Sequence, residues 1–302
     1  MNKREIDIYL SYWVFDEFDP VNLSDKLIQM LDRTRVAYYF ASLHHENVYM
    51  VTDSKTKCLF EDIPFTDIFV ELDDLNDMDT RYNRYWSISK IKTVEFAAKK
   101  ERPFIHIDND VFLMTELPDF LFEADVFCQN PEPTNDPEFV SYNIDTFYKM
   151  YDYLGYAKER VVNAYNTGLL GCMNIDFAKK FAASALEFTF HKDNTRILEI
   201  EHEKQNYNNK FLKITESSKN ISGLQAVLWN EQYYIGCAIE QEGVKVVCHF
   251  NSHDQIENLR LKNKNGWGYS HLMSGKEDPR IINEMSLMSN KIISCNYKHG
   301  CI

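Results

Sequence analysis

The sequence predicts an α/β fold in which helices flank a mainly parallel, Rossmann-like central sheet. Residues 6–14 and 47–52 are rich in β-forming side chains, and residues 22–34 between them carry leucines and an isoleucine at helical spacing. Further along, a helical pattern over residues 86–100 precedes a compact apolar strand at residues 103–107. Strands that alternate with helices pair in parallel, because each helix returns the chain to the same edge of the sheet.

Composition indicates a folded chain with an acidic surface. Hydrophobic residues make up 44% and aromatic residues 14% of the 302 residues, so side chains for a core are plentiful. The formal net charge of −13 would repel a phosphate backbone, which argues against nucleic acid as the main partner. A nucleoside diphosphate would need a metal ion to bind such an acidic protein.

Targeting and membrane signals are not found in the sequence. The first ten residues are charged and then β-like, and no stretch approaches the roughly 18–20 apolar residues of a transmembrane helix. The seven cysteines are scattered and form no C-x-x-C pair, which is typical of reduced cytoplasmic thiols, although a pairing of Cys295 with Cys301 stays open. We therefore expect a cytoplasmic protein, for which peripheral contact is the remaining form of membrane association.

The second half of the chain continues the alternation of strands and helices. Residues 130–137 contain three prolines and two asparagines and are expected to form a loop between two halves of the chain. Residues 165–172 hold two glycines in an apolar run, which indicates a strand that another backbone or a ligand approaches closely. Helical patterns follow at residues 177–190 and 223–234, and an irregular tail is expected from residue 251 onward.

Two carboxylates follow the apolar strand at residues 103–107. Asp108 and Asp110 are one residue apart, so both can approach one hard cation as the chain turns away from the sheet. Mg²⁺ and Mn²⁺ prefer oxygen ligands and bridge them to phosphate oxygens. An ordinary turn is the alternative explanation, because aspartate and asparagine are common where strands end.

An apolar strand followed by this acidic pair also resembles the first motif of haloacid-dehalogenase-like phosphatases. In that interpretation Asp108 is the phosphorylated nucleophile and Asp110 the general acid. The motif stands near the start of the catalytic core in those enzymes, whereas about a hundred residues with their own β-α-β pattern precede it here. We therefore favour a cation-binding role for the two aspartates over a phosphatase role.

Several short motifs follow one another along the chain: Ser11-Tyr12-Trp13, Thr52-Asp53, Trp86-Ser87-x-x-Lys90, Asp108-Asn109-Asp110, Asn166-Thr167-Gly168, Glu231-Gln232, and His271 with Gly275-Lys276. In this order they resemble the motifs of glycosyltransferases with the GT-A fold, especially the glycogenin-like and lipopolysaccharide-galactosyltransferase-like group and related bacterial transferases. The resemblance spans roughly residues 6–280, and the order of the motifs is more specific than any one of them.

The resemblance implies a role for each motif. Asp108, Asp110 and His271 are expected to hold Mn²⁺ or Mg²⁺, and Glu231 and Gln232 are expected to be the catalytic residues at the sugar. The family usually has H-x-x-G-x-x-K and an Asp-Gln pair, whereas this chain has H-x-x-x-G-K and Glu-Gln. The residues expected to bind the donor are Ser11, Asp53, Trp86, Lys90, Asp108, Asn109, Asn166, Gly168, Gly275 and Lys276.

The implied function is transfer of a sugar from a nucleoside-diphosphate sugar, expected to be a UDP-hexose, to a hydroxyl acceptor such as a glycan. Retention of anomeric configuration is the expected outcome. The implied organisation is one catalytic domain over residues 1–302, with a nucleotide-binding half at 1–128, an acceptor-side half at 129–250, and a segment at 251–302 that closes over the diphosphate. A catalytically silent carbohydrate-binding protein of the same fold is a further alternative.

Overall fold

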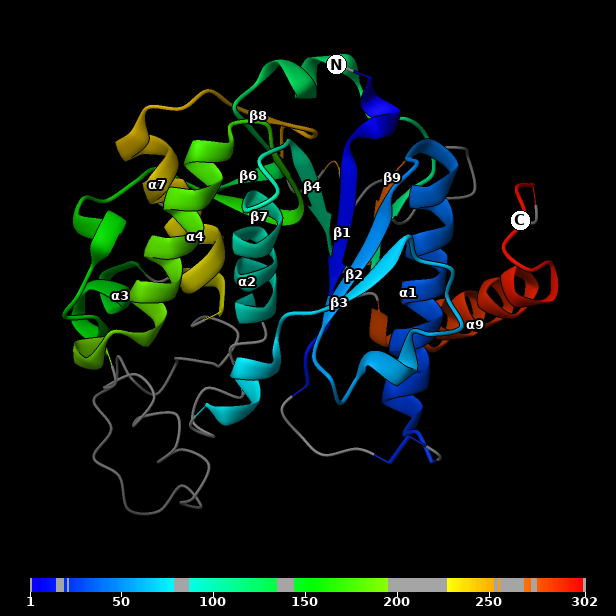
Figure 1. Cartoon of the computed structure of the whole chain (residues 1–302). Coiled ribbons are helices and arrows are strands. Elements are labelled where there is room, and N and C mark those ends of the chain that lie inside the picture. Colours follow the sequence, from blue (N-terminus) through cyan, green and yellow to red (C-terminus); the bar gives the residue numbers. More distant parts are fainter. Residues whose placement is uncertain are drawn as a thin grey trace.

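A seven-stranded sheet forms the centre of the molecule and has helices on both faces (Figure 1). The computed structural model describes residues 2–14, 19–20, 22–78, 87–134, 144–194, 227–252, 255, 269–272 and 276–300. The strand order is β3-β2-β1-β4-β7-β6-β8. Only the pairs that include β7 are antiparallel, so the predicted mainly parallel sheet is confirmed.

Seven strands form the central sheet, and two more strands form a separate ribbon. The central strands are β1 (Asp7–Ser11), β2 (Val48–Thr52), β3 (Asp67–Val70), β4 (Phe104–Ile107), β6 (Val126–Pro133), β7 (Asn163–Cys172) and β8 (Val246–Cys248). The ribbon consists of β5 (Val111–Leu113) and β9 (Tyr269–His271), which pair antiparallel.

The helices lie in two layers. Helix α1 (Asp25–His44) and helix α9 (Pro279–Ser294) pack together on one side of the sheet, and α2 (Ser87–Ala98) packs with α4 (Ile175–Phe190) on the other, next to α3 and α7 (Figure 1). The remaining helices are α3 (Ile144–Met150), α7 (Tyr234–Glu242), the π-helical turn η8 (Trp229–Tyr233), and the 3₁₀ helices Lys3–Glu5, Lys57–Leu59, Asp73–Asp77, Asp119–Glu123, Gly155–Lys158 and Lys192–Asn194.

Side-chain alternation along the strands divides the core between these two layers. Ile8 and Ile105 belong to the apolar cluster that includes α1, whereas their neighbours Tyr9 and Phe104 belong to the cluster that includes α2. All four side chains are buried. Because successive residues of a strand face opposite sides, both faces of the central strands must be apolar, as the continuous hydrophobic run around β4 indicated.

The loop predicted at residues 130–137 is wrong in part, because β6 continues through Pro133. Pro131 and Pro133 pair with Tyr165 and Asn163 of β7. The two prolines are two residues apart, so their missing N–H groups face the same edge. Among the described residues, strand β8 pairs with that edge of β6 only as far as Cys128 and no other strand pairs with it, so the two prolines remove no ladder bond there.

The tail predicted from residue 251 onward contains a helix, α9. Asp278 caps its N-terminus by accepting a hydrogen bond from the backbone N–H of Arg280 at 2.9 Å, and Pro279 occupies the first turn. Met285 and Ile292 are buried on the side of α9 that packs against α1. Glycine is absent from α9 itself, so the apolar stripe of the helix is not interrupted.

The cysteines were expected to be reduced thiols. Within the described part of the chain, the free cysteines are Cys58, Cys128, Cys172, Cys237 and Cys248, as expected of reduced thiols. Cys295 is disulfide-bonded, so the expectation of reduced thiols is wrong for that residue.

None of the described helices is both long and apolar enough to cross a bilayer.

Candidate functional site

The two aspartates lie where β4 leaves the sheet. The backbone N–H of Asp108 donates to the carbonyl of Gly168 at 2.9 Å, so the chain is still attached to β7 there. The N–H of Val111 then donates to the carbonyl of Asp108 at 3.0 Å, which closes a turn and starts β5. Both carboxylates therefore lie at the carboxyl end of a buried strand, where α/β sheets bind their ligands.

The ribbon of β5 and β9 brings His271 to the aspartates. Val111 pairs with His271, and the N–H of Leu272 donates to the carbonyl of Asp110 at 3.0 Å. One ligand atom from each of Asp108, Asp110 and His271 lies within 4.8 Å of the other two. These three residues form a group that could hold a metal ion.

The chemistry of this group fits a hard divalent cation. His271 Nε2 lies 3.4 Å from Asp110 Oδ1, and Oδ2 of Asp110 is buried and has no hydrogen-bond partner within the described ranges. Burial alone would raise the pKa of Asp110, but the neighbouring His271 and Lys276 hold that pKa below its usual range. An ionised carboxylate beside an imidazole nitrogen suits Mn²⁺ or Mg²⁺.

Lys90 of α2 is buried between two acidic side chains. Its Nζ lies 2.8 Å from Asp108 Oδ1 and 2.5 Å from Glu231 Oε1, and it donates to the carbonyl and hydroxyl oxygens of Thr167 at 3.2 Å each. Burial would lower the pKa of Lys90, but the two carboxylates more than offset this and raise it. The ammonium group therefore stays charged, and all of these contacts are internal to the protein.

Glu231 and Gln232 lie in the π-helical turn that precedes α7. The Glu231 carboxylate is buried and accepts hydrogen bonds from the Thr167 hydroxyl and from Lys90. Burial raises the pKa of Glu231, and the positive charge of Lys90 opposes that rise. Gln232 is half-buried. π-Turns often occur at functional sites because they re-aim side chains, and here the turn carries Glu231 to Lys90.

Ser11 and Asp53 lie at the carboxyl ends of β1 and β2, the same edge of the sheet as Asp108. Ser11 Oγ lies 2.9 Å from Nε2 of the buried His106, whose pKa burial lowers to about 3, so that imidazole is neutral. Asp53 is buried, and its Oδ1 accepts from the backbone N–H of Thr56 at 2.9 Å. Among the described residues, Asp53 Oδ2 has no hydrogen-bond partner.

Asn166 and Gly168 support the site from β7. The Asn166 amide donates to Glu132 Oε1 at 3.1 Å and accepts from the N–H of Gly168 at 3.0 Å. A Cβ atom added at Gly168 would lie 2.5 Å from Cε1 and 2.8 Å from Nδ1 of His271. Glycine at this position therefore leaves room for the His271 ring.

A comparison with models of protein families finds one family that matches most of the chain. The model described as "Family of unknown function (DUF6734)" matches residues 36–299. The chain belongs to this family. No curated protein matches the sequence.

Solved structures provide distant matches to this DUF6734 chain. The galactosyltransferase LgtC, in complex with donor and acceptor sugar analogs, is 11% identical, and the match covers 64% of this chain and 69% of LgtC with a TM-score of 0.37. The inositol-1-phosphate CTP transferase from T. maritima is 11% identical over 99% of each chain, with a TM-score of 0.40. A nucleoside-diphosphate-sugar pyrophosphorylase from Vibrio cholerae RC9 is 12% identical over 82% of this chain and 93% of its own, with a TM-score of 0.37.

Two predicted site residues lie outside the described part of the DUF6734 chain, and the structure places two further residues, not predicted from the sequence, beside the site. Trp86 and Gly275 are outside the described residues. Asn109 lies between the two aspartates, and its Oδ1 is buried with no hydrogen-bond partner in the described ranges. Sequence patterns did not single out Gln129 or Arg33. Gln129 Oε1 lies 2.7 Å from His271 Nδ1. Arg33 of α1 is half-buried, and its positive charge helps to lower the pKa of Asp110.

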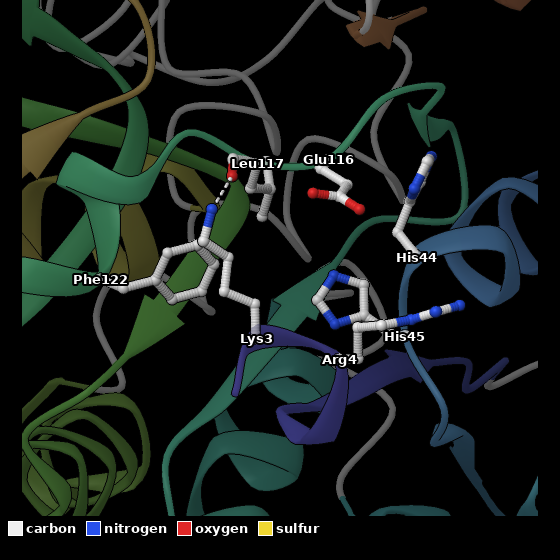
Figure 2. A pocket seen from close by; sticks show the side chains of 7 residues that line it. All are labelled: Lys3, Arg4, His44, His45, Glu116, Leu117 and Phe122. Atoms are coloured by element: carbon white, nitrogen blue, oxygen red, sulfur yellow. Dashed lines mark hydrogen bonds between the residues drawn. The ribbon is translucent and has the colours of Figure 1, made fainter. Parts of the chain in front are cut away.

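A small pocket lies at the opposite, amino-terminal ends of β1 and β2. Figure 2 shows the residues that line it: Lys3, Arg4, His44, His45, Glu116, Leu117 and Phe122. Lys3 is held there by a hydrogen bond to the carbonyl of Leu117 at 3.0 Å and by an ion pair with Asp119. None of the predicted site residues lines this pocket.

Proposed function

We propose that this protein is a glycosyltransferase that uses Mn²⁺ or Mg²⁺ and moves a sugar from a nucleoside-diphosphate sugar, with UDP-hexose as the expected donor, to a hydroxyl group of a glycan acceptor. The observation that carries the proposal is the convergence of Asp108, Asp110 and His271 at the carboxyl ends of the strands. The three residues come from β9 and from the turn after β4, which are far apart in sequence. The order of motifs in the sequence anticipated this group.

Asp108, Asp110 and His271 would hold the cation, which when bound neutralises the charge that develops on the departing diphosphate. Oδ2 of Asp110, which has no hydrogen-bond partner among the described residues, offers an anionic oxygen for this purpose. Lys276 lies 3.5 Å from that oxygen, and its side chain is 47% exposed. A half-exposed lysine can turn to a ligand, so we assign Lys276 to the diphosphate.

The deep position of Lys90 favours an indirect role. Because its ammonium group already contacts Asp108, Glu231 and Thr167, we propose that Lys90 orients the two carboxylates. It would contact the diphosphate itself only if binding of a cation to Asp108 frees the ammonium group. In either role the positive charge of Lys90 lies near the departing diphosphate and stabilises the negative charge that develops on it.

Ser11 and Asp53 lie at the ends of neighbouring parallel strands and are assigned to the nucleoside part of the donor. The buried, unshared oxygen of Asp53 can accept a hydrogen bond from a ribose hydroxyl or a base N–H. Asn166 and Gly168 belong to β7, which pairs with β4 on the side away from β1, and they would border the sugar together with Asn109.

Glu231 is proposed to act at the reacting sugar. Its carboxylate is held in place by Lys90 and Thr167, so it can stabilise positive charge at the anomeric carbon without reorganising. Gln232 is its neighbour in the same π-turn. We expect retention of anomeric configuration, which NMR of the product anomer measures.

The domain halves inferred from sequence stay a proposal. β6 crosses the division at residues 128 and 129 and lies in the same sheet as β1 and β4, so we treat the chain as one catalytic unit. The segment at 251–302 supplies His271 and Lys276, which fits a segment that closes over the diphosphate.

The first experiment is calorimetric titration of UDP, GDP and inorganic phosphate into the protein, each with and without Mn²⁺. We expect UDP to bind only in the presence of Mn²⁺, and Asp110→Asn to abolish this binding. Asp119→Asn is the matched control, because the Asp119 side chain is 85% exposed and its ion pair with Lys3 lies at the surface. UDP binding that is equal in both variants would contradict the metal assignment.

Turnover of UDP-sugars decides among the alternatives. Release of UDP that depends on Mn²⁺ and rises with an added glycan acceptor supports the transferase. UDP binding with no turnover of any donor indicates a silent carbohydrate-binding protein. Phosphatase activity without nucleotide binding indicates that Asp108 is a nucleophile and overturns the proposal.

A further inference from the structure

Gln129 contacts the predicted metal ligand His271 from the side that faces away from the aspartates. Gln129 Oε1 lies 2.7 Å from His271 Nδ1 and accepts a hydrogen bond from the Tyr269 hydroxyl at 2.5 Å. The amide nitrogen of Gln129 donates to Asn130 Oδ1 at 3.0 Å, which determines that the oxygen faces the histidine. Both lone pairs of this oxygen are therefore used.

This arrangement determines which ring nitrogen of His271 carries the hydrogen. An amide oxygen can only accept, so the hydrogen must lie on Nδ1. In the neutral imidazole, the form that binds a metal ion, Nε2 then has the lone pair, 3.4 Å from Oδ1 of Asp110. Two acceptor atoms that converge without a hydrogen between them form a natural position for a cation.

The backbone around Gln129 is built to hold this side chain in place. The register between β6 and β7 shifts between Cys128 and Asn130, so Gln129 lies in a bulge. Bulges commonly re-aim a side chain beside a functional site. The N–H of Phe250 donates to the Gln129 carbonyl at 2.8 Å, and a Cβ atom at Gly168 would lie only 3.0 Å from Gln129 Oε1.

We infer that Gln129 is a positioning residue that holds His271 in the tautomer able to bind the divalent cation. The inference rests on the proposed function, because it assumes that His271 is a metal ligand. Partners that orient a metal-binding histidine typically contribute about 10- to 100-fold to metal affinity.

The test compares three variants of the full chain by Mn²⁺ titration without nucleotide, monitored by electron paramagnetic resonance. Gln129→Met keeps the unbranched shape but removes the acceptor, and should weaken Mn²⁺ binding about 10- to 100-fold. Gln129→Glu keeps an acceptor oxygen and should retain binding. Tyr269→Phe removes the other hydrogen bond to the same oxygen and should leave the affinity close to that of wild type.

A second readout needs no metal. Long-range ¹H–¹⁵N spectra of the metal-free protein report histidine tautomers, and the His271 signal is the one lost in His271→Asn. We expect the Nδ1–H form in wild type, in Gln129→Glu and in Tyr269→Phe, and its loss in Gln129→Met. Thermal unfolding of each variant separates this effect from loss of folding.

The outcomes separate this inference from the proposed function. Failure of the wild type to bind Mn²⁺ would overturn the metal site and with it the role of Gln129 in binding. Tight Mn²⁺ binding by Gln129→Met, with the Nδ1–H form retained, would overturn the inference and leave the metal site standing.

Discussion

The ammonium group of Lys90 lies 2.5 Å from the Glu231 carboxylate and joins α2 to the π-turn before α7. The two residues are 141 positions apart in the sequence. Lys90 is also 2.8 Å from Asp108, so one positive charge serves two carboxylates. This ion pair links the candidate metal group to the candidate catalytic residue.

Lys90→Met should destabilise the fold strongly. Removing one partner of a buried ion pair leaves an unpaired buried charge, which typically costs about 3 to 5 kcal/mol. Urea unfolding followed by circular dichroism measures this cost. Glu231→Gln in the same chain removes the buried negative charge and keeps a hydrogen-bond acceptor for Thr167, so the double variant should lose less than the sum of the single changes. Additive losses would show that the pair is not coupled.

Gly168→Ala should impair metal binding more than folding. Its new Cβ atom would lie 2.5 Å from the His271 ring and must displace it. Gly171→Ala is the matched control on the same strand, because its Cβ atom would meet the Phe127 ring at 2.1 Å, away from His271. We expect both variants to lose about 1 to 3 kcal/mol of stability through overpacking.

Only Gly168→Ala should weaken Mn²⁺ binding. The measurement is Mn²⁺ titration of both variants under conditions in which thermal unfolding shows them to be folded. Equal Mn²⁺ affinity in the two variants would contradict a metal-binding role for His271.

His45 should make the folded state less stable as the pH falls. Burial lowers its pKa from an ordinary value of 6.5 to about 4, and its Nδ1 donates to the carbonyl of Ile6 at 3.2 Å. Between pH 6.5 and 4 the unfolded chain binds a proton at this position that the folded protein does not. Protonation of this histidine therefore does not affect the free energy of unfolding above pH 6.5. Below pH 6.5 the free energy of unfolding falls by about 1.4 kcal/mol per pH unit, until the folded protein also binds the proton near pH 4.

His45→Gln should flatten this pH dependence. Glutamine can still donate to the Ile6 carbonyl but does not titrate in this range. Urea unfolding at several pH values between 4 and 7 measures the slope for both proteins. Some slope should persist, because burial also lowers the pKa of His249, to about 4. An unchanged slope would indicate that His45 is protonated in the folded state.

Asp278→Ala should destabilise α9, which follows Lys276 in the chain. The Asp278 carboxylate caps the helix through the backbone N–H of Arg280 at 2.9 Å. Loss of such a cap typically costs about 1 kcal/mol, which urea unfolding can detect. Asp278→Asn keeps an acceptor oxygen and should be close to wild type. Equal losses in both variants would assign the effect to the charge and not to the cap.

Local patterns predicted much of the fold because period and composition are properties of neighbouring residues. The apolar run before Asp108 predicted β4, and helical spacing predicted α1, α2 and α4. The loop predicted at residues 130–137 was wrong in part, since the sequence does not reveal that the prolines of β6 turn their missing N–H groups away from β7. The helix α9 was missed although Asp278 and Pro279 form an ordinary helix start.

The sequence by itself determined the acidic pair at a strand end and the α/β class, because each depends on patterns of neighbouring residues. It also determined the order of the motifs, which is a property of the linear chain. Only the tertiary structure decided that His271 reaches Asp110, that Lys90 is shared by two carboxylates, and that Gln129 orients the histidine. These contacts join residues from different strands and helices. Their partners are set by strand register, a bulge and a π-turn, which depend on packing across the whole sheet.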